Sequence, residues 1–193
     1  MDARTIRTKE RTGRARLVLA VVVALVSTAC IAPPAGSPDT TVAAPVVDAP
    51  APAPGPAAAP LIEQWRAEML ASLNAQRAAT GAGPLADCGT LDMAAQRHSE
   101  DQAAHTTMSH TGSDGSSPWD RMARAGYTGW NVVAENVAYG YPTVGDVMAG
   151  WMASTGHRTN ILNPSVTQVG TGRATGPDGR PYWTQDFGAG GTC

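Results

Sequence analysis

Apolar residues recur at helical spacing at the start of the region that follows residue 60. Four of them stand four positions apart: Leu61, Trp65, Met69 and Leu73. This spacing places them on one face of a helix that ends near Gly81. A second helix is predicted over 87–105, and its shared face carries Leu91, Ala95, His98, Gln102 and His105.

Two shorter helices are predicted from capping residues. The capping pairs are Ser117 with Asp120 and Thr143 with Asp146. Pro118 occupies the first helical position of the earlier helix, where a missing N–H costs nothing. That helix closes at Gly126, and the later one runs through Trp151 and stops at Gly156.

The last part of the chain changes to strand patterns. Segments 168–174 and 181–187 flank a Gly-Pro-Asp-Gly turn at 176–179, and a further short strand is predicted at 132–135. Helices mostly precede strands, which indicates an α+β domain whose helices cover an antiparallel sheet.

The N-terminus has the pattern of a secretory signal. Six basic residues precede an uncharged run over 17–29 that is too short to span a bilayer. Small residues before Cys30 resemble the lipobox of bacterial lipoproteins, although Ser27 replaces the usual larger aliphatic residue. We expect residues 1–29 to be removed and Cys30 to carry a lipid that tethers the chain to the outside of the membrane. Ordinary cleavage and release is the alternative.

Composition separates a linker from one domain. Alanine and proline make up nineteen of residues 31–60, so segment 30–60 is predicted to be a disordered spacer. The remaining domain, 61–193, has eight Arg and no Lys against twelve Asp and Glu. Without a basic cluster, we expect no nucleic-acid partner, and neither a phosphate loop nor a dinucleotide motif is found. The domain is expected to be a monomer.

The chain has three cysteines. If Cys30 is acylated, Cys88 and Cys193 remain as one pair, and such pairs oxidise outside the cell. The predicted disulfide closes a loop of about a hundred residues, which the chain-entropy account values at roughly 4–5 kcal/mol. It also anchors the glycine-rich tail, 188–192.

Candidate chemistry centres on two of the four histidines. His98 and His105 are interpreted as packing residues of the second helix. His110 and His157 stand in loops among small residues, where sites concentrate. Glu135 lies in an apolar run, so its carboxylate is either paired or functional.

Two kinds of site fit these residues. His110, His157 and Glu135 could surround a zinc ion that keeps an open coordination position. Alternatively, Ser154 is a nucleophile, His157 its base and Glu135 the orienting acid. Neither a Gly-x-Ser-x-Gly elbow nor a His-Glu-x-x-His helix supports a choice, and both stay open.

Taken in order, several motifs resemble those of bacterial CAP (SCP-like) domains, over nearly all of 61–193. The superfamily comprises cysteine-rich secretory, antigen 5 and pathogenesis-related 1 proteins. The matching segments are 73–77, 83–85, 95–99, Ser-His-Thr-Gly at 109–112, Ala-Glu-Asn-Val-Ala at 134–138, 150–162, 169–172 and 182–187.

The resemblance implies an α-β-α sandwich, with helices on both faces of a central antiparallel sheet. It also implies a cavity with His110, Glu135 and His157, able in some members to hold zinc. Ser154 stands where many eukaryotic members have a second glutamate, so weaker metal binding is expected. Some members bind sterols or fatty acids, and no general reaction follows from membership.

Three candidate functions are consistent with these features of the chain. The first is an extracellular binding module for a small apolar ligand or an envelope component, with a cavity that can hold a metal. The second is a zinc-assisted hydrolase, with His110 and His157 as ligands and Glu135 as general base. The third is a purely structural envelope module.

Overall fold

A computed structural model describes residues 5–8 and 58–193, with side chains from Gln64 onward. The predicted signal segment apart from residues 5–8, the lipidation site Cys30, and the predicted linker up to residue 57 lie outside the described residues. Within the described ranges, none of the helices is long and apolar enough to cross a membrane.

Five helices and five strands are described. The helices are α1 (Ala58–Ala78), α2 (Gly89–Ala104), α3 (Pro118–Arg124), α4 (Val144–Ala153) and α5 (Thr155–Ile161). The strands are β1 (Thr5–Thr8), β2 (Ala86–Asp87), β3 (Val132–Tyr139), β4 (Gln168–Thr175) and β5 (Pro181–Ala189). They form one sheet in the order β1-β3-β5-β4-β2.

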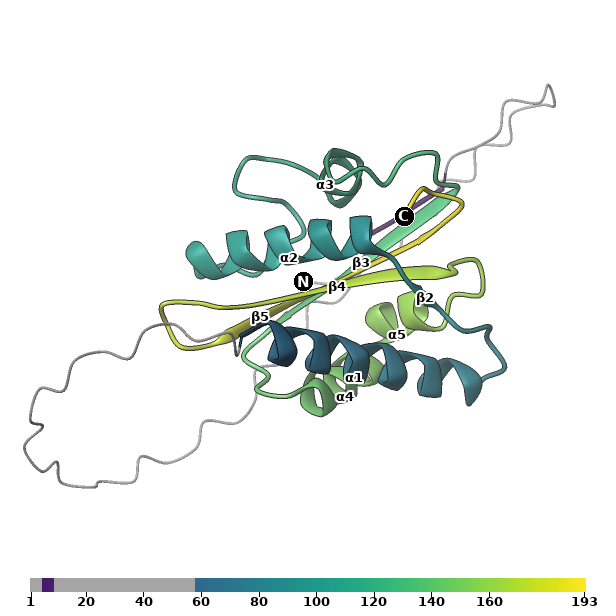
Figure 1. Ribbon diagram of the computed structural model, residues 1–193, viewed down its shortest axis with the longest axis horizontal. Helices are drawn as coiled ribbons and strands as arrows, with labels where there is room; N and C mark the ends of the chain where they lie inside the picture. The colour runs from purple at the N-terminus through teal and green to yellow at the C-terminus, as the bar shows by residue number, and fades with distance from the viewer. Residues whose placement is uncertain (1–4, 9–57) are drawn as a thin grey trace, which may run out of the picture.

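Helices cover both faces of this sheet. Figure 1 shows α2 and α3 on one side of the strands and α1, α4 and α5 on the other. The α-β-α sandwich expected from the sequence is therefore confirmed. The expectation of a purely antiparallel sheet is wrong, because β2 runs parallel to β4. The segment that follows α1 lies beside β4 and runs in the same direction. There the Ala86 and Cys88 N–H groups donate hydrogen bonds to the carbonyl oxygens of Thr167 and Val169.

The predicted helices are found, with two corrections. The capping box of Ser117 and Asp120 and the cap of Thr143 on Asp146 N–H are both present. His105 does not share the buried face of α2; it caps the helix and is exposed. The fourth helix does not continue to Gly156, because Ser154 is extended (ψ 124°) and a separate helix, α5, starts there.

Alternation along β3 divides the core into two layers. Val132, Ala134 and Ala138 face α1, α4 and α5, where Trp151, Trp183 and Phe187 are buried. Val133 faces the opposite layer with Leu91, Met122 and Tyr127. Because successive strand residues point to opposite faces, Glu135 belongs to the layer of α2 and α3.

Helix α2 lies directly on the backbone of β4. A Cβ on Gly170 would overlap backbone atoms of Leu91 and Asp92, and one on Gly172 would overlap those of Ala95. Only glycine permits this approach. Asp92 completes the contact by accepting a hydrogen bond of 2.6 Å from Thr171 N–H.

A buried arginine joins α1 to the loops around α5. Arg77 is 1% exposed and its guanidinium donates to four carbonyls, those of Gly83, Ile161, Asn163 and Val166, over 2.6–3.1 Å. Asn74 similarly exchanges two hydrogen bonds with the backbone of Leu85. Both side chains thus join α1 to backbone groups of the loops that follow it in space.

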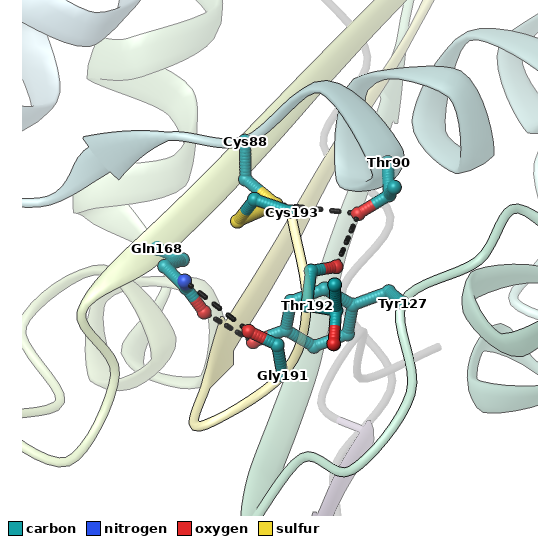
Figure 2. The surroundings of a disulfide bond; sticks show 7 residues. All are labelled: Cys88, Thr90, Tyr127, Gln168, Gly191, Thr192 and Cys193. Carbon is teal, nitrogen blue, oxygen red and sulfur yellow. Dashed lines mark hydrogen bonds between the residues drawn. A yellow bond between two sulfur atoms is a disulfide. The ribbon is translucent and has the colours of Figure 1, made fainter.

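The predicted disulfide between Cys88 and Cys193 is present, with the two Cα atoms 5.1 Å apart. Figure 2 shows how the tail reaches it: Thr192 O accepts from the Thr90 hydroxyl, and Gly191 packs on the ring of Tyr127. The Tyr127 hydroxyl in turn donates to Gln168 at 2.6 Å. The tail is thus held at the start of α2, beside the start of β3.

We expect Gly172→Ala to destabilise the domain by about 2 kcal/mol or more, since either α2 or β4 must shift to admit the methyl group. Gly89→Ala is the matched control within α2, because nothing lies within 4 Å of its added Cβ. Chemical denaturation of both variants measures the effect. Equal stability of the two would show that the close approach is not needed.

Candidate functional site

The structure brings Glu135 and His110 together. Glu135, on β3, is fully buried, and its Oε1 lies 2.6 Å from His110 Nδ1. Its Oε2 accepts a hydrogen bond of 2.5 Å from Arg121 Nη2 on α3. Arg121 also donates to His110 O and to Ser116 O, each at 3.0 Å, so the loop that carries His110 is bound to α3 at two points.

A second histidine lies at the edge of this cluster. His98 is fully buried in α2, donates from Nε2 to Ser109 O at 2.8 Å and lies 4.0 Å from Glu135 Oε2. Burial lowers the pKa of His98, and the Glu135 charge opposes that effect only in part. Its interpretation as a packing residue agrees with these contacts, and it also positions the residue before His110.

A second carboxyl group lies across the sheet from Glu135. Asp186 on β5 is the cross-strand partner of Glu135 and is fully buried. Neither of its oxygens has a hydrogen-bond partner among the described residues. An ionised carboxylate in that setting would be strongly disfavoured.

The two carboxyl groups differ in protonation. Burial acts to raise the pKa of Glu135, but the hydrogen bond from His110 and the charge of Arg121 outweigh it and hold the pKa below its usual value. Burial, reinforced by the negative charge of Glu135, raises the pKa of Asp186 well above its usual value. The two shifts favour an ionised Glu135 beside a protonated Asp186 near neutral pH.

The remaining predicted site residues, His157 and Ser154, come from the opposite layer. His157 belongs to α5, and its carbonyl accepts a hydrogen bond of 3.3 Å from Asn136 on β3. Ser154 is half-buried between α4 and α5, and its side chain does not cap α5. Of the two histidines, the structure pairs His110 with the carboxylate of Glu135.

The hydrogen bond to Glu135 determines which nitrogen of His110 is available. Because a carboxylate accepts, Nδ1 carries a proton toward Glu135, and in the neutral ring it is Nε2 that presents a lone pair. Nε2 is buried and has no hydrogen-bond partner among the described residues. A carboxylate that orients a histidine in this way is the arrangement found behind metal-binding imidazoles.

The described ranges contain no group of three or more His, Cys, Asp or Glu side chains arranged to hold a metal ion. The available donor atom of His110 fits one zinc ligand, and both oxygens of Glu135 are already bonded. Zinc binding by His110 and His157 therefore stays a prediction.

Sequence reasoning missed two members of the cluster. Arg121 follows a capping box on a short helix, and nothing in its local sequence marks it as the partner of Glu135. Asp186 could have been found, since alternation along 181–187 places it on the same face as neighbouring buried residues of β5. Recognising its pairing with Glu135 requires the strand register, which a sequence pattern does not supply.

With this geometry in place, comparisons with known proteins identify the family. The family model of CAP, the cysteine-rich secretory protein family, matches residues 70–187. The chain therefore belongs to the CAP family. Among curated proteins, YkwD of Bacillus subtilis is 32% identical over 126 residues, which cover 65% of this chain and 48% of YkwD.

Solved structures agree on the fold. An extracellular protein containing an SCP domain from Bacillus anthracis is 26% identical with a TM-score of 0.58, over 65% of this chain and 40% of that one. An outer surface protein from Borrelia burgdorferi has a TM-score of 0.60 at 20% identity, over 65% and 92% of the two chains, and shows the fold alone. This chain thus matches only about half of the length of YkwD and less of the B. anthracis protein.

The raised pKa of Asp186 gives a pH-dependent prediction. The folded state retains this proton at pH values where the unfolded chain has lost it, so folding stability falls as pH rises from about 4 toward the raised pKa. Asp186→Asn cannot ionise, so we expect it to be more stable than the parent at neutral pH and to converge with it below about pH 4.

Denaturation at several pH values measures this difference. Asp87→Asn is the control, because Asp87 is an exposed carboxyl on β2. A destabilised Asp186→Asn at neutral pH would show that the parent carboxyl is ionised and satisfied in the folded state.

Proposed function

We propose that this chain is an extracellular binding module of the CAP family, whose site lies around His110 and Glu135 and takes a small apolar ligand or an envelope component. The observation that carries the proposal is the oriented His110, whose Nε2 is left available by the Glu135 contact. Burying the ion pair of Glu135 and Arg121 carries a desolvation cost. The hydrogen bonds that both residues make with His110 help to offset it.

An extracellular location has three supports. Residues 1–29 have the pattern of a secretory signal, and the Cys88–Cys193 disulfide is typical of oxidising compartments. The B. anthracis relative is described as extracellular. Acylation of Cys30 would hold the module at the membrane surface.

A metal in the site is part of the proposal. His110 and His157 would be the zinc ligands, with water in the remaining positions and Glu135 holding His110 in the required tautomer. Ser154 in place of a second glutamate removes a negative charge, which favours weak binding. Zinc-assisted hydrolysis would need Glu135 as a base, whereas Glu135 is bonded to His110 and Arg121, so no observation favours this alternative.

Zinc titration of the full chain tests the site. We expect binding at one ion per chain, and we expect His110→Ala with His157→Ala to weaken it by about tenfold or more while the thermal unfolding transition stays cooperative. His105→Ala is the matched control, because His105 is exposed at the end of α2.

Three outcomes separate the functions. Zinc binding lost only in the double variant supports the metal site. No binding by the parent would overturn both the metal site and the hydrolase, leaving a metal-free module to be tested with lipids and envelope fractions. Loss of folding in the double variant would support the structural module.

The lipid anchor is tested in cells. If Cys30 is acylated, the mature chain begins at that residue with the added mass of its lipids, and it sediments with membranes. Cys30→Ser should release the protein into the medium or leave its signal segment uncut. Membrane association of a Cys30→Ser chain whose signal segment has been removed would contradict the lipid anchor.

A further inference from the structure

The outer edge of β3 is closed by side chains along only part of its length. Glu135 O accepts from Asn160 Nδ2 at 3.1 Å, and Val137 O accepts from Trp151 Nε1 at 3.3 Å. Both carbonyls therefore point away from β5. The Trp and Asn of the 150–162 motif thus close this edge of the strand.

The other half of the edge is closed by a strand. Since backbone groups alternate in direction along a strand, those of Val133 point outward like those of Glu135 and Val137. They meet β1, whose Thr5 and Arg7 are in antiparallel register with Glu135 and Val133. Figure 1 shows β1 beside β3 at the margin of the sheet, away from β4 and β2.

β1 lies within the segment expected to be removed as a signal. Loss of residues 1–29 would leave the outward N–H and C=O groups of Val133 and the N–H of Glu135 without this strand. Side chains of residues 132–135 point to the two faces of the sheet, so what the edge presents is mainly backbone. An open edge of this kind is a template for pairing with another extended segment.

We propose that Val132–Glu135 of β3 is a docking site for a basic, extended peptide segment of a partner protein, which adds an antiparallel strand next to the His110 site. The inference rests on the proposed extracellular binding role but not on zinc.

The strand found in this position indicates the chemistry of the partner. Segment Thr5–Thr8 reads Thr-Ile-Arg-Thr, rich in β-branched residues that favour strands, and Arg4 and Lys9 flank it. The domain it meets has eight Arg and no Lys against twelve acidic residues over 61–193. Main-chain hydrogen bonds supply the affinity in such strand addition, and opposite charge favours encounter.

The docking position also connects the edge to the site. Glu135 pairs with Thr5 through its backbone while its side chain holds His110. A peptide added here would therefore lie against the strand residue that orients the histidine.

Hydrogen exchange of the full chain tests the proposal. In the parent, β1 should protect the amides of Val133 and Glu135. Arg7→Pro removes an N–H that faces β3, and we expect it to speed exchange at both amides roughly tenfold while Thr184 in β5 is unchanged. Ile6→Pro is the matched control, because the Ile6 N–H points away from β3.

The same Arg7→Pro chain then serves as the receptor for a synthetic peptide of residues 2–10. Saturable return of protection at Val133 and Glu135, absent with a peptide carrying Arg7→Pro, is the expected result. No return of protection would overturn the proposal, as would equal loss in Ile6→Pro. Protection that instead rises with protein concentration alone would overturn it too, by showing that a second copy occupies the edge. The zinc titration is independent of these results.

Discussion

The close contact between α2 and β4 is the constraint on which the rest of the structure depends. Glycine at positions 170 and 172 lets the helix backbone lie against the strand, and a side chain at either position would lift it away. With α2 this close to the sheet, His98 Nε2 lies 4.0 Å from Glu135 Oε2. The same nitrogen donates a hydrogen bond to Ser109 O and so positions the residue that precedes His110. Strand β4 therefore helps to position the site, although none of the side chains described in the site comes from β4.

Charge balance within the buried layer is asymmetric. Arg121 and His110 both bind Glu135, whereas Asp186 has no cation of its own and stays protonated. One ionised and one neutral carboxyl group in adjacent strands allow the layer to hold a single negative charge without further cations. The sheet register brings these two groups together, because Glu135 and Asp186 are cross-strand partners.

Local patterns in the sequence were sufficient for most of the fold. The four-residue spacing from Leu61 predicted α1, capping residues predicted the starts of α3 and α4, and the Gly-Pro-Asp-Gly turn placed β4 and β5. The parallel strand β2 is too short to show an alternating pattern. The break between α4 and α5 depends on the extended backbone of Ser154, which the residue type does not predict. In the site, local patterns singled out His110 and Glu135 and the family motifs supported them, whereas Arg121 and Asp186 required knowledge of helix placement and of register.

The disulfide turns most of the domain into a closed ring. Residues 88–193 include α2 through β5, and with them every side chain of the cluster around Glu135. A single peptide-bond cleavage in an exposed turn such as residues 177–180 opens the ring but releases no fragment, because both ends remain joined through sulfur. Cleavage before residue 88 removes only α1 and what precedes it. For a protein exposed to extracellular proteases, the site thus stays covalently intact after a first cut, and only a second cut or reduction can detach part of it.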